Sequence, residues 1–168
     1  GHHRGQDFRP KRLPPSHGWA IENGAVFAEA GAWLRAQWYQ RPDETSWQES
    51  VSREAAAVRR SVGICDVSTL GKIDIQGPDA ATFLDRVYVN KFATLKVGRA
   101  RYGLMLREDG FAMDDGTTSR LGENHFVMTT TTANAGKVMQ HLEFCRQVLW
   151  PGLNLRLVSV SDQWAQYS

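Results

Sequence analysis

Two adjacent carboxylates, Asp114 and Asp115, are the residues of this sequence best placed to do chemistry. They lie in a stretch, Tyr102–Thr132, where apolar or β-branched runs are broken by polar turns, which predicts strands. Carboxylates in a half-buried strand are costly unless another group satisfies them. Because side chains alternate along a strand, only one of the pair can face a given side. A carboxylate facing an apolar cleft could accept N–H donors from a heterocyclic ligand and take or hold a proton.

A structural interpretation of the acidic pair competes with this one. Both carboxylates could instead cap turns or pair with Arg107 or Arg120. The run Thr129–Thr132 allows the same two interpretations, because its hydroxyls could line a pocket or cap a helix that begins at Ala133. The residue pattern alone leaves both interpretations open.

Other recognisable chemical motifs are missing from the sequence. It holds no glycine-rich phosphate loop, no HExxH and no paired-cysteine metal motif, and its serine and cysteine nucleophiles have no recognisable partner. We expect the five histidines to be surface or structural residues. Cys65 and Cys145 lack metal-type spacing, and their apolar neighbours predict buried thiols. We therefore expect no metal site.

The acidic pair must be positioned by three strands and the elements around them. Turns at Glu108–Gly110 and Leu121–Asn124 divide Tyr102–Thr132 into three strands joined by hairpins. The remaining pattern predicts a helix capped by Ser46 or Ser50 and ended by Gly63, with Val51, Ala55, Val58 and Val62 at helical spacing; strands over Ile64–Val67 and Lys72–Gln76; a helix after Gly77–Asp79; a helix over Ala133–Leu149; and a strand over Leu153–Val160. Strands in a run, backed by helices, indicate an α+β domain with a mainly antiparallel sheet.

The beginning of the chain has a weaker pattern. Residues 1 to about 18 are expected to form an extended arm because Pro10, Pro14 and Pro15 disfavour helix. Trp19–Phe27 contains an Asn23-Gly24 turn and predicts a hairpin or a covering loop. Ala28–Tyr39 mixes helix formers with aromatic residues, and the pattern assigns no element there.

Composition sets broad limits on the protein class. A length of 168 residues suits one domain, and a hydrophobic content of 42% is ordinary for a globular protein. A formal net charge of +2 gives no argument for nucleic acid or acidic lipid as a partner. No apolar run approaches a membrane span and no signal peptide opens the chain, so we expect a cytoplasmic protein. Trp164–Ser168 resembles the start of another strand, so we expect the sequence to be a truncated part of a longer chain.

Long stretches of the sequence resemble a known family. They are VGICDVSTLGKIDIQGPDAATFLDRVYVNKF, from Val62, and RYGLMLREDGFAMDDGTTSRLGENHFVMTTTT, from Arg101. Both are similar to the C-terminal part of the alpha subunits of heterotetrameric sarcosine oxidases, and HGWAIENGAVFAEAGAWLRAQWY, from His17, resembles the lead-in to that part. The D-V-S, Q-G-P and D-D elements match, more distantly, the aminomethyltransferases (T-proteins) of the glycine cleavage system and the folate domain of dimethylglycine dehydrogenases. The resemblance covers the chain from about Gly5.

The resemblance implies an aminomethyltransferase-like folate-binding fold of two similar half-domains. Residues 46–168 would be the first half, and residues 1–45 an extended arm and lead-in. In such enzymes a flavin in the beta subunit oxidises the N-methyl group of sarcosine to an imine, and tetrahydrofolate takes up the one-carbon unit, which yields glycine and 5,10-methylenetetrahydrofolate. The flavin and NAD would belong to other parts of the complex. The partners implied are the other subunits and folate, with no nucleic acid and no membrane.

The resemblance also implies residue roles. Asp115 matches the key folate-site carboxylate, which holds the folate and aids proton movement. Leu70 matches an apolar position against the pterin, Tyr102 a neighbouring strand position, and Thr129 and Thr131 strand-end positions at the polar edge of the ligand.

Departures from the family pattern limit these implications. Thr69-Leu70 replaces the His-Met of the aminomethyltransferases, and Gly116–Thr118 replaces their apolar triplet, which favours the sarcosine oxidase branch. Two alternatives remain: an aminomethyltransferase of the glycine-cleavage type, and a non-catalytic relative used for protein contact or iron–sulfur maintenance. Because the second half-domain is absent, we expect the isolated chain to be inactive, to bind folate weakly and to self-associate.

Overall fold

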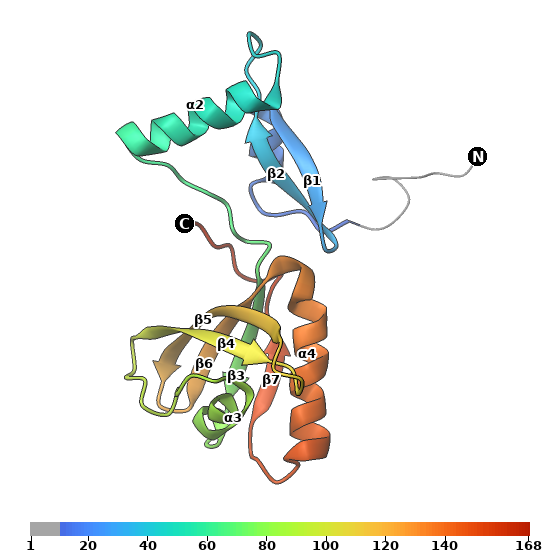
Figure 1. Ribbon diagram of the computed structural model, residues 1–168. Helices are drawn as coiled ribbons and strands as arrows, with labels where there is room; N and C mark the ends of the chain where they lie inside the picture. Colours follow the sequence, from blue (N-terminus) through green and yellow to red (C-terminus); the bar gives the residue numbers. More distant parts are fainter. Residues whose placement is uncertain (1–10) are drawn as a thin grey trace, which may run out of the picture. The chain divides into compact units, whose positions relative to one another are not determined.

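The computed structural model describes residues 11–168, so the first ten residues of the predicted arm lie outside the described residues. The chain divides into two compact units (Figure 1). Among the described residues, unit 1 contains residues 11–69 together with Ala165–Ser168, and unit 2 contains Leu70–Trp164. Among the described residues, none of the helices is both long and apolar enough to cross a membrane.

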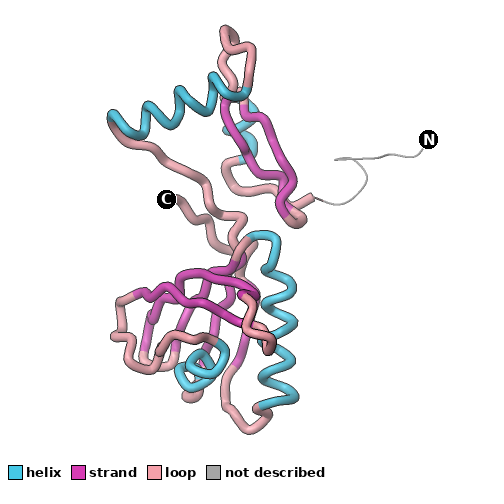
Figure 2. The backbone as a smooth tube through the Cα atoms, viewed as in Figure 1, coloured by secondary structure: helices cyan, strands magenta, loops and turns pink. Residues whose placement is uncertain are grey.

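Unit 2 is a five-stranded sheet with helices, and its strand order is β4-β5-β6-β3-β7. Each neighbouring pair is antiparallel, which confirms the predicted α+β class with a mainly antiparallel sheet. Figure 2 distinguishes the strands of this sheet from the helices beside them. The elements are β3 (Gly71–Gln76), α3 (Ala80–Val87), β4 (Ala100–Leu106), β5 (Ala112–Gly122), β6 (His125–Thr130), a 3-10 helix (Thr132–Asn134), α4 (Ala135–Phe144), a π-helix (Cys145–Leu149) and β7 (Arg156–Ser159).

One face of this sheet forms the core of unit 2. Ile73, Met105 and Met128 alternate with outward-facing residues along their strands and are fully or almost fully buried. The helices supply the other side of the core, because Phe83 and Leu84 of α3 and Val138 and Leu142 of α4 are buried in the same cluster. We refer to the face that carries this cluster as the inner face, and to the opposite face as the outer face.

Unit 1 contains a short helix, a hairpin and a long helix. They are α1 (His17–Glu22), β1 (Ala25–Ala30), β2 (Trp33–Tyr39) and α2 (Trp47–Arg60). The hairpin predicted over Trp19–Phe27 is wrong, because Asn23 and Gly24 end α1 instead of joining two strands. Gly24 has a φ of 78°, and its N–H donates to the carbonyl oxygen of Ile21. Such a left-handed glycine closes a helix as readily as it turns a hairpin.

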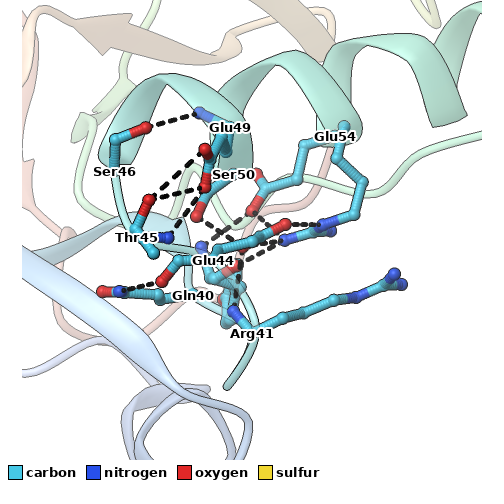
Figure 3. A network of polar contacts seen from close by, with 10 residues as sticks. Gln40, Arg41, Glu44, Thr45, Ser46, Glu49, Ser50 and Glu54 are labelled. Carbon is cyan, nitrogen blue, oxygen red and sulfur yellow. Dashed lines mark hydrogen bonds and ion pairs between the residues drawn. The ribbon is translucent and has the colours of Figure 1, made fainter.

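The N-terminus of α2 is held by a polar network (Figure 3). Of the two predicted candidates, Ser46 and not Ser50 is the N-cap, and its hydroxyl accepts the N–H of Glu49 at 3.4 Å. The Glu49 carboxylate reaches back to the N–H of Thr45 at 2.7 Å. Glu44 accepts from the Ser50 hydroxyl at 2.6 Å and from Arg53 Nε at 2.5 Å. The hydrogen bond from Arg53, followed by that from Ser50, lowers the pKa of Glu44 to about 2.

Several sequence expectations for unit 1 need correction. The helix α2 ends at Arg60 and not at Gly63, so Val62 lies beyond it; among the described residues Val58 is 54% exposed and Val62 is 82% exposed. Ile64–Val67 is not a regular strand, since only Asp66 forms a bridge, with Tyr167. Cys65 is exposed, contrary to expectation, whereas Cys145 is buried, and both are free thiols.

Candidate functional site

The predicted site residues of unit 2 lie in two adjacent rows across the outer face of the sheet. In the first row Tyr102 of β4 pairs with Thr117 of β5, and Lys72 of β3 pairs with Thr129 of β6. Thr117 and Thr129 join these pairs through hydrogen bonds of 3.0 and 3.1 Å.

The second row lies two residues further along each strand. Leu104 pairs with Asp115, and Gly71 pairs with Thr130, so Leu70 and Thr131 flank the last pair of the β3–β6 ladder. The register therefore brings Tyr102, Asp115, Thr129, Thr131 and Leu70 to one end of one sheet, over four neighbouring strands. Neighbouring strands are about 4.8 Å apart, so the rows span the width of a small planar ligand.

The two carboxylates of the acidic pair have separate surroundings. Asp114 is only 7% exposed and opposes Met105 on the inner face. It accepts from the N–H of Thr131 at 3.1 Å and from Asn134 Nδ2 at 3.2 Å. Asp114 therefore accepts the donors of the turn between β6 and the 3-10 helix. This is the turn-capping role that the sequence analysis gave as one of two alternatives.

Asp115 is exposed on the outer face. Its carboxylate accepts a hydrogen bond from the hydroxyl of Tyr102, which is 61% exposed. Neither carboxylate pairs with an arginine, because Arg107 pairs with Asp109 and Arg120 donates to the carbonyl oxygen of Leu95 at 2.7 Å. The arginine alternative is wrong, and Asp115 keeps an exposed carboxylate beside an exposed phenol.

The two threonines of the predicted site make hydrogen bonds that hold the strands and the following turn in place. The Thr129 hydroxyl accepts from the N–H of Thr117 and donates to its carbonyl oxygen, so it replaces a pair of ladder bonds between β5 and β6. Gly116 explains why it does so, because a Cβ there would lie 2.2 Å from the carbonyl oxygen of Thr129. Thr131 is exposed beside this point, and its N–H is taken by Asp114.

Tyr88 lies on the inner side of the same strands, where burial and nearby negative charge both affect its pKa. Burial raises the pKa of Tyr88 to about 12, and the charges of Asp114 and Asp115 add to this rise. The ring of Tyr88 also lies 2.8 Å from where a Cβ on Gly103 would be. Tyr88 is therefore a neutral packing residue beneath the site near neutral pH.

Sequence reasoning missed Lys72 as part of this neighbourhood. Lys72 occupies the first row beside Thr129, yet it is only 2% exposed, and its ammonium donates to the carbonyl oxygen of Leu70 at 3.1 Å. The sequence carried no signal for this burial, because period-two alternation places Lys72 with Asp74 and Gln76 on the polar side of β3 and lysine is rarely buried. Among residues 11–168 no group of three or more potential metal ligands comes together.

The pronounced hollows of the two units do not contain the predicted site residues. A hollow of about 580 Å³ in unit 1 is lined largely by apolar and aromatic side chains, among them Trp19, Val58 and Ile64. A hollow of about 400 Å³ in unit 2 lies between the β4–β5 turn and α4, with His141 and Phe144 in its wall. Within the predicted site itself, Tyr102, Asp115 and Thr131 are exposed on the outer face.

The fold is that of an aminomethyltransferase-like domain. Aminomethyltransferase T of the glycine cleavage system from Bartonella henselae has a solved structure that matches with a TM-score of 0.77 and 25% identity, over 89% of this chain and 38% of that one. The GCVT N-terminal domain family matches residues 16–168, ahead of the predicted domain start at residue 46, and the chain belongs to this family.

Sequence relatives point to one branch of the family. The chain is 63% identical, over 99% of its length, to the sarcosine oxidase subunit alpha of Rhizobium meliloti, and 48% identical to that of a Corynebacterium species (strain P-1) over 98%. It is 38% identical to the aminomethyltransferase of Thermus thermophilus over 69% of the chain and 32% of that protein. The chain spans only 17% of the length of the sarcosine oxidase subunits.

Proposed function

We propose that this chain is the tetrahydrofolate-binding segment of a sarcosine oxidase alpha subunit. In the whole enzyme, which includes a flavin-containing beta subunit, oxidative demethylation of sarcosine supplies a one-carbon unit. Tetrahydrofolate supplies the nitrogens that take up this unit, and the products are glycine and 5,10-methylenetetrahydrofolate. The higher identity to sarcosine oxidase subunits than to aminomethyltransferases supports this branch.

The observation that carries the proposal is the division of labour within the acidic pair. The carboxylate of Asp114 is buried and accepts hydrogen bonds from Thr131 and Asn134. The carboxylate of Asp115 is exposed on the outer face. Asp115 can accept N–H donors from a pterin and hold a proton that is released when the folate nitrogens react. Tyr102 keeps this carboxylate oriented through its hydroxyl.

The other residues of the two rows support the same ligand. Leu70 offers an apolar contact at the β3 end, and Thr131 offers a hydroxyl at the β6 end of the same row. Thr129 contributes by holding β5 to β6, since its hydroxyl is engaged with the backbone of Thr117. A flat ring with N–H groups on one edge fits a carboxylate, a hydroxyl and an apolar side chain along one row.

The experiment is Asp115→Ala in the complete enzyme, with methylenetetrahydrofolate formed per sarcosine consumed as the readout. We expect sarcosine oxidation to continue while this ratio falls at least tenfold, because the variant loses only folate-side chemistry. Glu108→Ala, an exposed carboxylate in the β4–β5 turn, is the matched control and should leave the ratio unchanged. An unaltered ratio in Asp115→Ala would remove Asp115 from the mechanism.

Two alternatives predict different results. An aminomethyltransferase of the glycine-cleavage type would need no flavin subunit, so purification as a colourless, self-sufficient protein favours it. A non-catalytic relative would be indifferent to Asp115→Ala in every assay. The isolated chain is expected to bind tetrahydrofolate more weakly than micromolar, and micromolar binding in calorimetry would contradict that expectation.

A further inference from the structure

A buried lysine lies directly beside the proposed folate site. Lys72 is the second residue of β3 and pairs with Thr129, so it occupies the same row as Tyr102 and Thr117. Although this row lies on the outer face, Lys72 is only 2% exposed, whereas Tyr102 at the other end of the row is 61% exposed.

The hydrogen bonds of Lys72 connect the start of β3 to the segment after β7. Its ammonium donates to the carbonyl oxygens of Leu70 and Ser161, at 3.1 and 3.4 Å. Its backbone N–H donates to the hydroxyl of Ser161 at 2.9 Å, and its carbonyl oxygen accepts from the N–H of Val160 at 2.9 Å. One residue therefore holds two chain segments with both its backbone and its side chain.

Burying an ammonium group has a cost that an apolar side chain of similar size avoids. A methionine would fill the same space without desolvating a charge, so stability alone gives weak reason for a lysine here. One of the bonds that the ammonium adds is directed to Leu70, which precedes the first β3–β6 pair at Gly71 and Thr130. The lysine thus fixes a carbonyl group at the point where the ladder begins.

The backbone next to Leu70 is tightly packed on one side. A Cβ on Gly71 would lie 2.1 Å from the Thr130 hydroxyl and 2.6 Å from the Cβ of Ala135. Gly71 therefore fixes the strand from the β6 and α4 side, and Lys72 fixes the preceding residue through its carbonyl oxygen. Together they define where the Leu70 side chain enters the second row.

We infer that Lys72 is a positioning residue of the folate site, which acts by holding Leu70 against the ring of the ligand. This inference rests on the proposed function. It assigns Lys72 no contact with the folate and no proton transfer. It predicts that loss of the ammonium weakens tetrahydrofolate binding through Leu70 and leaves sarcosine oxidation unchanged.

The test is a double-mutant cycle in the complete enzyme, with Lys72→Met, Leu70→Ala and the double variant. Tetrahydrofolate affinity is measured by calorimetry, and the rate of sarcosine oxidation is measured separately. Lys72→Met should weaken tetrahydrofolate binding about two- to tenfold, the range for one lost hydrogen bond. The same change should have almost no effect when Leu70 is already alanine, because contacting residues are non-additive. Lys137→Met, an exposed lysine on α4, is the control.

The outcomes separate this inference from the proposed function. Lys72 is not a positioning residue if either Lys72→Met or Leu70→Ala leaves tetrahydrofolate binding unchanged. The same conclusion follows if the losses of binding free energy in the two single variants sum to the loss in the double variant. If Asp115→Ala and Leu70→Ala both leave folate binding unchanged, the proposed function itself fails. Should Lys72→Met not fold, Lys72→Gln replaces the ammonium with a shorter, uncharged donor and should show a smaller, equally Leu70-dependent loss.

Discussion

The hydroxyl of Tyr102 donates a hydrogen bond to the carboxylate of Asp115, from one strand to a diagonal position on the next. Tyr102 directly opposes Thr117, two residues along β5 from Asp115, so the contact joins the two rows of the outer face. Diagonal neighbours on antiparallel strands are within reach of long aromatic side chains. Because both groups are exposed, the bond orients the carboxylate without closing it off from a ligand.

Tyr102→Phe should weaken folate binding and leave folding intact. The variant removes only the hydroxyl, so we expect the tetrahydrofolate affinity of the complete enzyme to fall about two- to tenfold. The free energy of unfolding should change by less than about 0.5 kcal/mol, because the side chain is largely exposed. Calorimetric titration together with urea denaturation measures both quantities. A large loss of stability would show that Tyr102 has a structural role instead.

Substitutions of Asp114 and Asp115 should have clearly different effects on the free energy of unfolding. Asp114→Ala leaves the Thr131 N–H without its acceptor and the Asn134 amide with only the Met113 carbonyl oxygen, so the free energy of unfolding should fall by about 1–3 kcal/mol. Asp115→Ala, one residue away, should stay within about 0.5 kcal/mol of the original. Urea denaturation followed by circular dichroism compares the two variants. Equal losses in both would contradict the division of labour within the pair.

The sequence pattern was sufficient to predict most of unit 2. Period-two alternation predicted β3 and the three-strand region, and its hydrophobic face set which residues would be buried. What the pattern could not supply was the partner of Asp114, because Asn134 is twenty residues away and meets it only once α4 has packed. The choice between structural and exposed carboxylate therefore required the folded sheet.

Unit 1 was predicted less well because its signals are ambiguous. A glycine with positive φ ends α1 at Gly24 and turns the β1–β2 hairpin at Gly31, and the sequence does not distinguish these uses. The spacing of Val51 and Val58 identified one face of a helix, but not whether another segment covers it. Amphipathic spacing predicts a helix face and leaves its partner undetermined.

The network at the N-terminus of α2 should make unit 1 sensitive to acid. The pKa of Glu44 is lowered to about 2 by the hydrogen bonds from Arg53 and Ser50. A group whose pKa is lowered on folding stabilises the protein above its unfolded value and loses this contribution as the pH falls. The contribution of Glu44 should therefore disappear between about pH 4.5 and pH 2.

Glu44→Gln is the variant that tests this sensitivity. It should lower the urea midpoint of unit 1 at pH 7 and flatten its further decline between pH 4.5 and pH 2. Tryptophan fluorescence can follow the transition, because Trp38 and Trp47 lie close together in unit 1. Glu22→Gln, an exposed carboxylate on α1, is the control and should retain the decline of the original protein. Parallel pH profiles for the original protein and Glu44→Gln would contradict the assignment.

The close approach of β5 to β6 gives a final test of how the outer face is built. An alanine at Gly116 would place its Cβ 2.2 Å from the Thr129 carbonyl oxygen, a backbone atom that cannot move without shifting β6. Gly116→Ala should therefore lower the free energy of unfolding by about 1–3 kcal/mol, the usual range for overpacking.

Gly136→Ala is the matched control, because an added Cβ on α4 meets nothing within 4 Å. It should stabilise the protein by about 0.5–1 kcal/mol through helix propensity. If urea denaturation showed that Gly116→Ala costs no stability, the close strand approach that places Thr129 against Thr117, and with it the row beside Asp115, would be wrong.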